Sequence, residues 1–307
     1  MAWIAFWTLV VLIAAGVVVR VNDLRFRRKL ADAVAELGAR RAAHTPIDRS
    51  RIDRLPPPVR RYLNKALEAR EYLIRSAHFL HSGTFRPRLD GRWFPIRGRE
   101  YVFTEPLGFI WWGRLEILPG FWVDAIDRFV RGLGSLKVTL ASSIVVVDAS
   151  GPAFNRGELL RVLSEMPLYP TLMLDSRYVA WTSIDERHAR ARLRMGALEV
   201  HGVFEFSDSD MPIEFVATRE RDLGGGKTEM TPWSGRFYDF RMSAGVRVPH
   251  RLEAAWHVAG KRTPYARFQI DLIEFDRIGE ATEPGPETGT GDHPGLPSMR
   301  AANRIGV

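Results

Sequence analysis

The feature that most constrains this chain is an uncharged apolar run at its N-terminus. The run extends from Ala2 to Val19, contains a single clearly polar residue, Thr8, and ends at Arg20. A helix of this length spans about 27 Å at about 1.5 Å per residue, which is close to the hydrocarbon thickness of a bilayer. We therefore expect a transmembrane anchor over residues 1–20.

The main alternative to an anchor is a cleaved signal peptide, because Ala14, Ala15 and Gly16 resemble a cleavage site. A signal peptide carries basic residues before its apolar core. Here only the α-amino group precedes the run, and the basic residues follow it instead. The sequence therefore favours an uncleaved, single-pass anchor in the cell membrane.

The distribution of charge predicts on which side of the membrane the body lies. The formal net charge is +8, with 14 Lys/Arg and 6 Asp/Glu in residues 20–70 and 30 of each kind in residues 71–307. Basic residues that flank an apolar span stay on the cytoplasmic side, so we expect a cytoplasmic body. An extracytoplasmic body is the alternative, because this rule weakens before large domains.

The basic segment also bears on the partners of the chain. Residues 20–41 are suited to contact anionic lipid headgroups, at about 1 kcal/mol for each nearby Lys or Arg. Nucleic-acid binding needs a basic stripe on the folded body, and the balanced charge of residues 71–307 argues against it. The sequence therefore predicts a membrane as partner and no nucleic acid.

No motif for catalysis or metal binding stands out. The chain has no cysteine, which excludes disulfides, thiolate metal sites and cysteine nucleophiles. His78 and His81, the closest pair of histidines, would point to opposite faces of a strand. Gly226-Lys227-Thr228 lacks the earlier glycine and the following helix that a phosphate-binding loop needs. We expect no catalytic residue, no metal and no cofactor.

The body is predicted to be rich in β-strands. From about Ile74 to Ile278 apolar and polar residues alternate, as in Ala189, Ala191 and Leu193 between arginines. We expect a mainly β fold over residues 55–278: a large, curved, mostly antiparallel sheet or incomplete barrel, a half-barrel. Residues 21–54 are predicted to be a basic juxtamembrane helix and linker, and residues 279–307 a disordered tail.

One helix interrupts the strands. Asn155 and Glu158 are spaced as in a capping box and precede an apolar stretch that ends at Pro167 and Pro170. An apolar helix inserted among strands is expected to cover one face of the sheet.

Aromatic residues spread over many strands suggest what the concave face of this sheet would hold. A curved sheet with one covering helix can leave a cavity that large rings line for an apolar molecule. Asp127 lies on an otherwise apolar strand face and Glu165 on the covering helix; a buried acid there needs a partner such as an arginine. The predicted ligand-binding residues are Phe109, Trp111, Asp127, Glu165, Trp181, Phe204 and Trp256.

Several short motifs resemble an uncharacterised bacterial family, a domain of unknown function that is often anchored by an N-terminal helix. They are LPPPVRRYL at 55–63, HSGTF at 81–85, PLGFIW at 106–111, RGLG at 131–134, LSE at 163–165, YPT at 169–171, WTSID at 181–185 and GVRVP at 245–249. In architecture the chain remotely resembles lipoprotein carriers of the LolA type. That resemblance implies a half-barrel closed by helices around a lipid-binding cavity, in proteins that work outside the cytoplasm.

Three hypotheses for function follow. The first is a membrane-anchored domain that binds a lipid or another apolar molecule, without catalysis. The second is a hydrolase or isomerase that acts on a membrane-derived substrate through a histidine and acids from distant strands. The third is a non-catalytic scaffold with a filled core and an exposed apolar patch.

Overall fold

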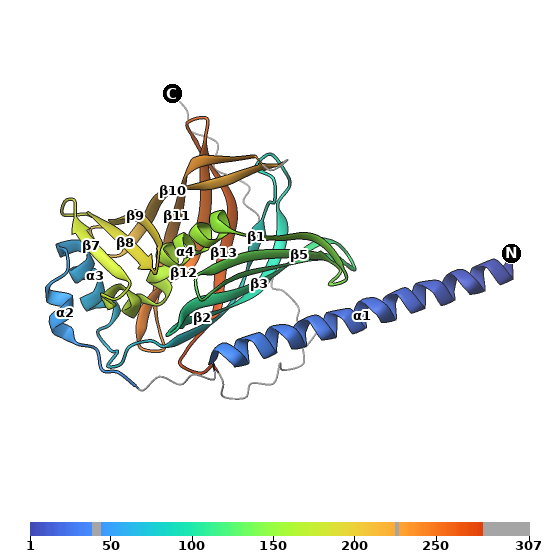
Figure 1. Ribbon diagram of the computed structural model, residues 1–307, viewed down its shortest axis with the longest axis horizontal. Coiled ribbons are helices and arrows are strands. Elements are labelled where there is room, and N and C mark those ends of the chain that lie inside the picture. The colour runs from blue at the N-terminus through green and yellow to red at the C-terminus, as the bar shows by residue number, and fades with distance from the viewer. Residues whose placement is uncertain (39–43, 225–226, 279–307) are drawn as a thin grey trace, which may run out of the picture.

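The computed structural model describes residues 1–38, 44–224 and 227–278, and its centre is a single open sheet that curves strongly (Figure 1). The expected mainly β fold is confirmed: thirteen antiparallel strands form the sheet, and β6 and β7 are its unpaired edges within the described residues. The predicted tail, residues 279–307, lies outside the described residues. The strands are β1 (Ser76–Phe85), β2 (Phe94–Thr104), β3 (Leu107–Leu118), β4 (Phe121–Val130), β5 (Leu133–Leu140), β6 (Ile144–Ser150), β7 (Val179–Ser183), β8 (His188–Met195), β9 (Leu198–Phe206), β10 (Pro212–Gly224), β11 (Lys227–Ser243), β12 (Val246–Val258) and β13 (Lys261–Phe275).

The order of the strands divides the sheet into two arms. From one edge to the other it reads β6-β5-β4-β3-β2-β1-β13-β12-β11-β10-β9-β8-β7. Within each arm every strand pairs with its neighbour in sequence, and the arms meet where β1 pairs with β13. The connection between the arms therefore runs from one free edge, β6, to the other, β7.

That connection contains the covering helix. α4 (Pro152–Glu165) is followed by the 3₁₀-helices η1 (Met166–Leu168) and η2 (Pro170–Leu174), and it crosses the concave face of the sheet (Figure 1). The expected capping box is wrong, because the helix begins three residues earlier, at Pro152, after Gly151 with φ 123°. The Asn155 side chain instead accepts a hydrogen bond from the Gly134 amide at 2.7 Å.

The core lies between α4 and the sheet, and a second pair of helices closes one end of it. Leu159 and Leu163 of α4 are fully buried in the same cluster as Phe129, Phe204 and Phe215. α3 (Pro57–Ala66) begins with prolines that suit the first turn of a helix, and Tyr62 on its buried side contacts Phe206. The short α2 (Arg49–Asp53), capped by Asp48, lies where the sequence analysis expected only linker.

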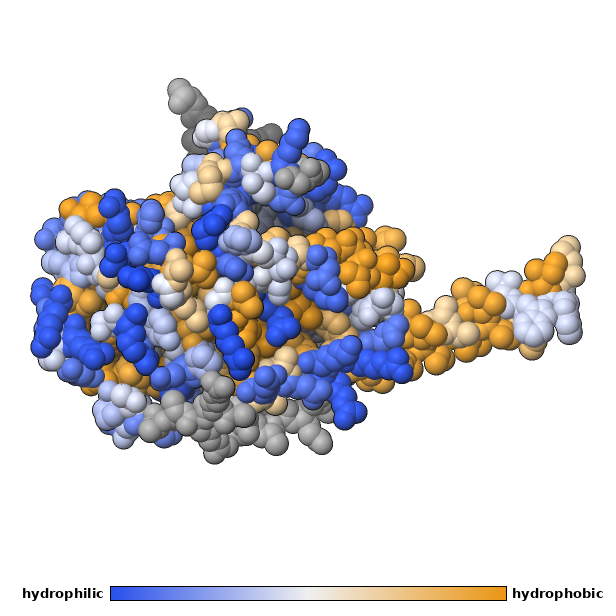
Figure 2. Space-filling view, viewed as in Figure 1, coloured by the Kyte–Doolittle hydropathy of each residue, from blue (hydrophilic) through white to orange (hydrophobic). Residues whose placement is uncertain are grey.

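α1 (Ala2–Gly38) is one continuous helix that passes through the boundary expected near residue 20. Within the described residues it is the one helix long and apolar enough to cross a membrane, a test that a signal sequence also passes. Its N-terminal half projects from the body with an apolar surface (Figure 2). Its C-terminal half lies on the outer face of the sheet, where Leu30, Val34 and Leu37 pack around Phe103 and Ile110.

A buried polar network ties α1 to this outer face. Arg114 on β3 donates to Asp23 of α1 at 2.5 Å and to Asp124 of β4 at 2.8 Å. Asp124 is fully buried and accepts hydrogen bonds, at 2.6–3.1 Å, from Trp112, Arg114, Trp122 and Ser142. Residues 22–38 are therefore an integral layer of the body rather than a loose tether.

This network predicts a large effect of one substitution. Asp124→Ala leaves the Arg114 guanidinium buried with half of its partners, so we expect a loss of about 3–5 kcal/mol in the free energy of unfolding. The exposed pair between Asp148 and Lys137, at 3.2 Å, offers the control, and Asp148→Ala should cost less than about 1 kcal/mol. Denaturation of the full chain in detergent, followed by circular dichroism, measures both. Equal effects would contradict the structural role of Asp124.

Candidate functional site

The concave face contains a buried ionic cluster centred on Arg161 of α4. The guanidinium donates to Glu100 at 2.9 Å, to Asp127 at 3.0 Å and to Glu165 at 2.8 Å. It also lies over the rings of two aromatic residues, with 4.6 Å to the centre of Phe109 and 5.2 Å to that of Trp111. We refer to Arg161 with Glu100, Asp127, Glu158 and Glu165 as the Arg161 cluster.

The register of the sheet explains why these side chains meet. Glu100 on β2 pairs with Trp111 on β3, which pairs with Asp127 on β4. The three side chains therefore form a row across the strands on the face that α4 covers. Arg161 and Glu165 stand one helical turn apart, so both reach down to this row.

Trp111 connects the cluster to His81 on β1. The indole Nε1 donates to His81 Nε2 at 2.8 Å, which places the ring proton on Nδ1. Two glycines make room for this arrangement: a Cβ on Gly98 would lie 2.5 Å from His81 Nε2, and one on Gly113 would lie 2.3 Å from the Trp111 ring. Burial lowers the pKa of His81 to about 3, so the imidazole is neutral.

Several polar atoms of this region are buried without a hydrogen-bond partner. They are His81 Nδ1, Glu158 Oε2, Glu165 Oε2 and Arg219 Nε. Glu158, one turn before Arg161, is 5% exposed. Buried polar atoms of folded proteins are otherwise almost always hydrogen-bonded, so such a concentration in one region is unusual.

Three carboxyl groups of the cluster, those of Glu100, Asp127 and Glu158, resist ionisation. Burial, together with the nearby charge of Asp127, raises the pKa of Glu158 to about 8. Burial and the charge of Glu165 raise the pKa of Glu100, and burial raises that of Asp127. Four carboxyl groups share the region with two guanidinium groups, those of Arg161 and Arg219, so at least one acid is held protonated near neutral pH.

Arg219 on β10 is the second cation near the cluster. Its guanidinium lies 5.7 Å from the centre of the Trp233 ring and 5.6 Å from that of Trp256. Trp256 stacks on Tyr265, whose hydroxyl accepts a hydrogen bond from Trp233 at 3.0 Å. In contrast to Arg161, Arg219 forms no ion pair within the part of the chain that the structure describes.

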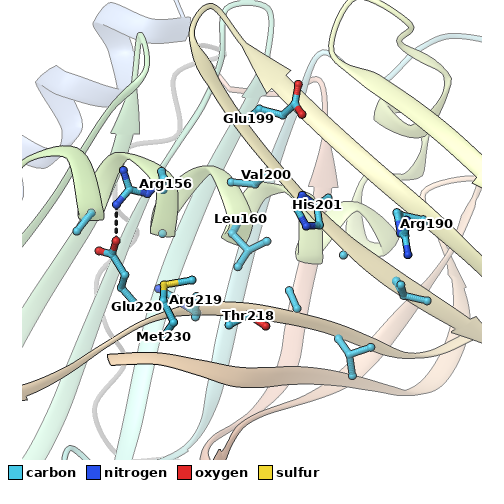
Figure 3. A pocket seen from close by; sticks show the side chains of 16 residues that line it. Arg156, Leu160, Arg190, Glu199, Val200, His201, Thr218, Arg219, Glu220 and Met230 are labelled. Atoms are coloured by element: carbon cyan, nitrogen blue, oxygen red, sulfur yellow. Dashed lines mark hydrogen bonds and ion pairs between the residues drawn. The ribbon is translucent and has the colours of Figure 1, made fainter. Parts of the chain in front are cut away.

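Arg219 also lines a slot that opens through the wall of the sheet. β9 and β10 pair from Phe206 and Pro212 as far as Val203 and Val216. Beyond that point they diverge, and α4 lies behind the gap (Figure 3). The slot has a volume of about 490 Å³; its lining includes Leu160 and Gly157 of α4, Val200 and His201 of β9, and Arg219 of β10. An ion pair between Arg156 and Glu220 crosses one end of it.

The predicted ligand-binding residues fall into three groups. Phe109, Trp111, Asp127 and Glu165 meet at Arg161, and the arginine partner expected for Asp127 is present. Trp256 lies beside Arg219. Trp181 and Phe204 contact each other, with ring centres 5.8 Å apart, and the Trp181 indole donates to the Met173 carbonyl at 3.0 Å. Trp181 therefore packs against η2, and Phe204 also contacts Phe215 of β10, with ring centres 4.7 Å apart.

Sequence reasoning missed Arg161, Glu100 and Arg219. Arg161 had a signal, because Arg161 and Glu165 are spaced by one helical turn within an apolar segment. Glu100 and Arg219 had none, because each lies in an alternating strand where charged residues are also the rule on the solvent face. Only the register of the paired strands shows which of these charged residues lie on the concave face.

The hydrolase hypothesis called for a histidine–carboxylate pair in a cleft. Within residues 1–38, 44–224 and 227–278, histidines pair with carboxylates at His78–Glu274, 3.1 Å, and at His188–Asp185, 2.9 Å. Neither pair lines the slot. In the same residues no group of three or more His, Asp or Glu side chains is arranged to hold a metal.

Comparison with known families and structures places the chain. A family of unknown function, DUF6544, matches residues 45–268, and the chain belongs to it, which confirms the expected membership in an uncharacterised family. No curated protein matches.

Three solved structures that match are remote in sequence. A LolA superfamily protein from Nitrosomonas europaea is 13% identical with a TM-score of 0.36, over 69% of this chain and 91% of that one. A DUF1329 family protein from Desulfovibrio piger is 9% identical with a TM-score of 0.32, over 80% and 93%. A beta-barrel-like protein from Brucella abortus is 8% identical with a TM-score of 0.22, over 66% and 98%. At this distance no function is transferred from them.

The shifted groups of the site predict how stability depends on pH. The folded pKa of Glu158, about 8, lies above its ordinary 4.5, so its contribution is complete below about pH 4.5 and is lost as the pH rises to about 8. The folded pKa of His81, about 3, lies below its ordinary 6.5, so stability is lost as the pH falls from about 6.5 towards 3.

We therefore expect Glu158→Gln to flatten the decline in stability between about pH 6.5 and 8, by up to about 1.4 kcal/mol per pH unit. The decline in stability as the pH falls below about 6.5, which His81 causes, should remain. Chemical unfolding of the full chain across this range measures both slopes. An unchanged alkaline slope in the variant would show that Glu158 ionises freely in the folded protein.

Proposed function

We propose that this protein is a single-pass membrane protein whose body binds an amphipathic molecule, such as a lipid, beneath α4. The observation that carries the proposal is the Arg161 cluster with its unpartnered polar atoms. Each buried polar atom without a partner costs about 1–3 kcal/mol. A purely structural ion pair has no need of such atoms, whereas a ligand headgroup that bears oxygen atoms and hydroxyls would satisfy them.

The two cations of the region differ in a way that supports this proposal. Each of the three guanidinium nitrogens of Arg161 already donates to a carboxylate. Arg219 is held between aromatic rings without an ion pair among the described residues, so its donors are free for a phosphate, carboxylate or carbonyl oxygen. We assign to Arg219 the main contact with the polar end of the ligand, with Asp127 and Glu165 positioned next to it.

The aromatic side chains around the cluster supply the apolar part of the proposed site. Phe109, Trp111 and Trp256 surround the two guanidinium groups, and Trp181 and Phe204 form the end wall beneath η2. Rings of this kind provide large apolar contact areas, which suits an acyl or isoprenoid chain. The slot between β9 and β10 is the proposed entrance, because its lining joins the surface to Arg219 and Leu160.

Membrane attachment completes the proposal. The exposed apolar half of α1 supports a spanning anchor, and the basic residues after it, Arg25, Arg28 and Lys29, are placed to contact anionic headgroups. The excess of basic residues on this flank supports a cytoplasmic body. A protein held at the bilayer in this way could take a lipid ligand from the membrane, so the ligand would not have to cross the aqueous phase.

Ligand binding is tested by native mass spectrometry of the full chain released from detergent micelles. We expect the wild-type protein to retain one lipid mass. Arg219→Met should weaken retention roughly 10- to 100-fold, because it removes a charged hydrogen-bond donor. Arg192→Met, an exposed arginine of β8 outside the lining of the slot, is the control and should retain the ligand.

The melting temperatures of both variants separate binding from folding. Retention equal to wild type in Arg219→Met, or a wild-type chain with no stoichiometric adduct, would contradict the proposed site. Loss of the adduct together with a collapse of the melting temperature would make Arg219 a structural residue.

The side of the membrane is tested with a single cysteine, because the natural chain has none. Ile184 is exposed at the turn between β7 and β8, far along the chain from α1. In intact cells, Ile184→Cys should react with a membrane-permeant maleimide and be protected from an impermeant one. Labelling by the impermeant reagent would place the body outside the cytoplasm.

A further inference from the structure

One end of the sheet exposes a concentration of large apolar side chains. At the tip between β3 and β4, Leu118 is 61% and Phe121 58% exposed, next to Pro119 and Gly120. On the edge strand β6, Ile144–Val147 are also exposed. Figure 2 shows apolar surface at this end of the body, where α1 leaves it. A patch of this kind on a folded protein marks a contact with a partner or a membrane.

Direct contacts fix the position of this end relative to α1. The turn between β5 and β6 is joined to the helix by hydrogen bonds from Asn22 to Ser143 and from Ser142 to Asp23, each 3.1 Å long. Asn22 and Asp23 stand immediately after the apolar run. The turn therefore lies at the level at which the proposed membrane span begins.

The β3–β4 tip extends further towards the membrane. Asp124 and Asp23 both accept hydrogen bonds from Ser142 and Arg114, so the two acids lie at the same level along the axis of α1. Phe121 is three residues beyond Asp124, about 10 Å at the rise of a strand. The hairpins point the same way as the N-terminal half of α1 (Figure 1). Along a helix, about 10 Å corresponds to six or seven residues, which brings the tip level with the apolar run near Val17.

We infer that the β3–β4 tip, Leu118 and Phe121, enters the bilayer leaflet nearest the body, beside α1, and forms a second membrane contact. This inference rests on the proposal that α1 spans the membrane. A second copy of the chain paired along the edge strand β6 is the competing occupant of the apolar end. Such pairing would leave the β3–β4 tip uncovered, because β5 lies between this hairpin and the edge strand β6.

Two membrane contacts would give the body one orientation. α1 lies along the outer face of β3, β4 and β5, and the tip lies at the end of β3 and β4. These strands would therefore stand upright on the bilayer. The concave face and α4 would then be held at a constant height above the headgroups.

The test uses single cysteines in the full, naturally cysteine-free chain, each labelled with an environment-sensitive fluorophore. The labelled proteins are reconstituted in vesicles of phosphatidylethanolamine and phosphatidylglycerol that contain nitroxide-labelled lipid. We expect the probes at Leu118→Cys and Phe121→Cys to be quenched several-fold more strongly than a probe at Ile184→Cys, an apolar position that is 48% exposed at the β7–β8 turn. Quenching no stronger than at Ile184 would overturn the inference.

A probe at Leu12→Cys, within the apolar run, separates the two proposals. Quenching at Leu12 without quenching at the tip would leave the anchor intact and reject the second contact. Absence of quenching at both would reject the anchor itself. Energy transfer between probes on different chains, with no quenching by lipid, would assign the apolar end to a second copy and overturn the membrane contact.

Discussion

The position of α4 depends on one buried guanidinium. Arg161 is the point at which the helix that joins the two arms of the sheet is held against β2 and β4 by ionic hydrogen bonds. A buried ion pair of this kind adds little net stability compared with an apolar contact, because desolvation offsets the attraction. It does restrict the helix to a single placement, because any shift or rotation of α4 would leave charged groups without partners in an apolar interior. The positions of Glu158, of the unpartnered atoms and of the slot follow from this placement.

The outer face of the sheet repeats the same device with a different helix. Arg114 links Asp23 of α1 to Asp124 of β4, as Arg161 links α4 to Asp127 of the same strand. β4 thus carries one acid on each face, Asp124 fully buried and Asp127 partly buried, and each acid engages an arginine that fixes a helix. The body is a sandwich of helix, sheet and helix around this strand, with a ligand chamber proposed on one side and membrane attachment on the other.

The sequence identified the strands and the long helices, but it missed the short α2 and could not give the register of the sheet. Alternation identifies the strands, and the apolar run identifies the N-terminal half of α1, because both patterns are local. The arginine partner of Asp127 followed from the cost of burying an acid, although the choice of Arg161 depended on where α4 crosses the sheet. Glu100 and Arg219 look like surface residues until pairing places them on the concave face. Trp181 and Phe204 share the aromatic character of Trp111, and only tertiary contacts separate them from the cluster.

The pairing of β1 with β13 has a consequence for biosynthesis. β1 begins at Ser76 and its partner ends at Phe275, so the first strand leaves the ribosome long before the strand that covers its free edge. The hairpins of the first arm can form early because their contacts are local, yet β1 offers an open edge to other chains until β13 has been synthesised. The nascent first arm is therefore the species most exposed to mispairing. The seam at the centre of the finished sheet is also the last part of it to be made.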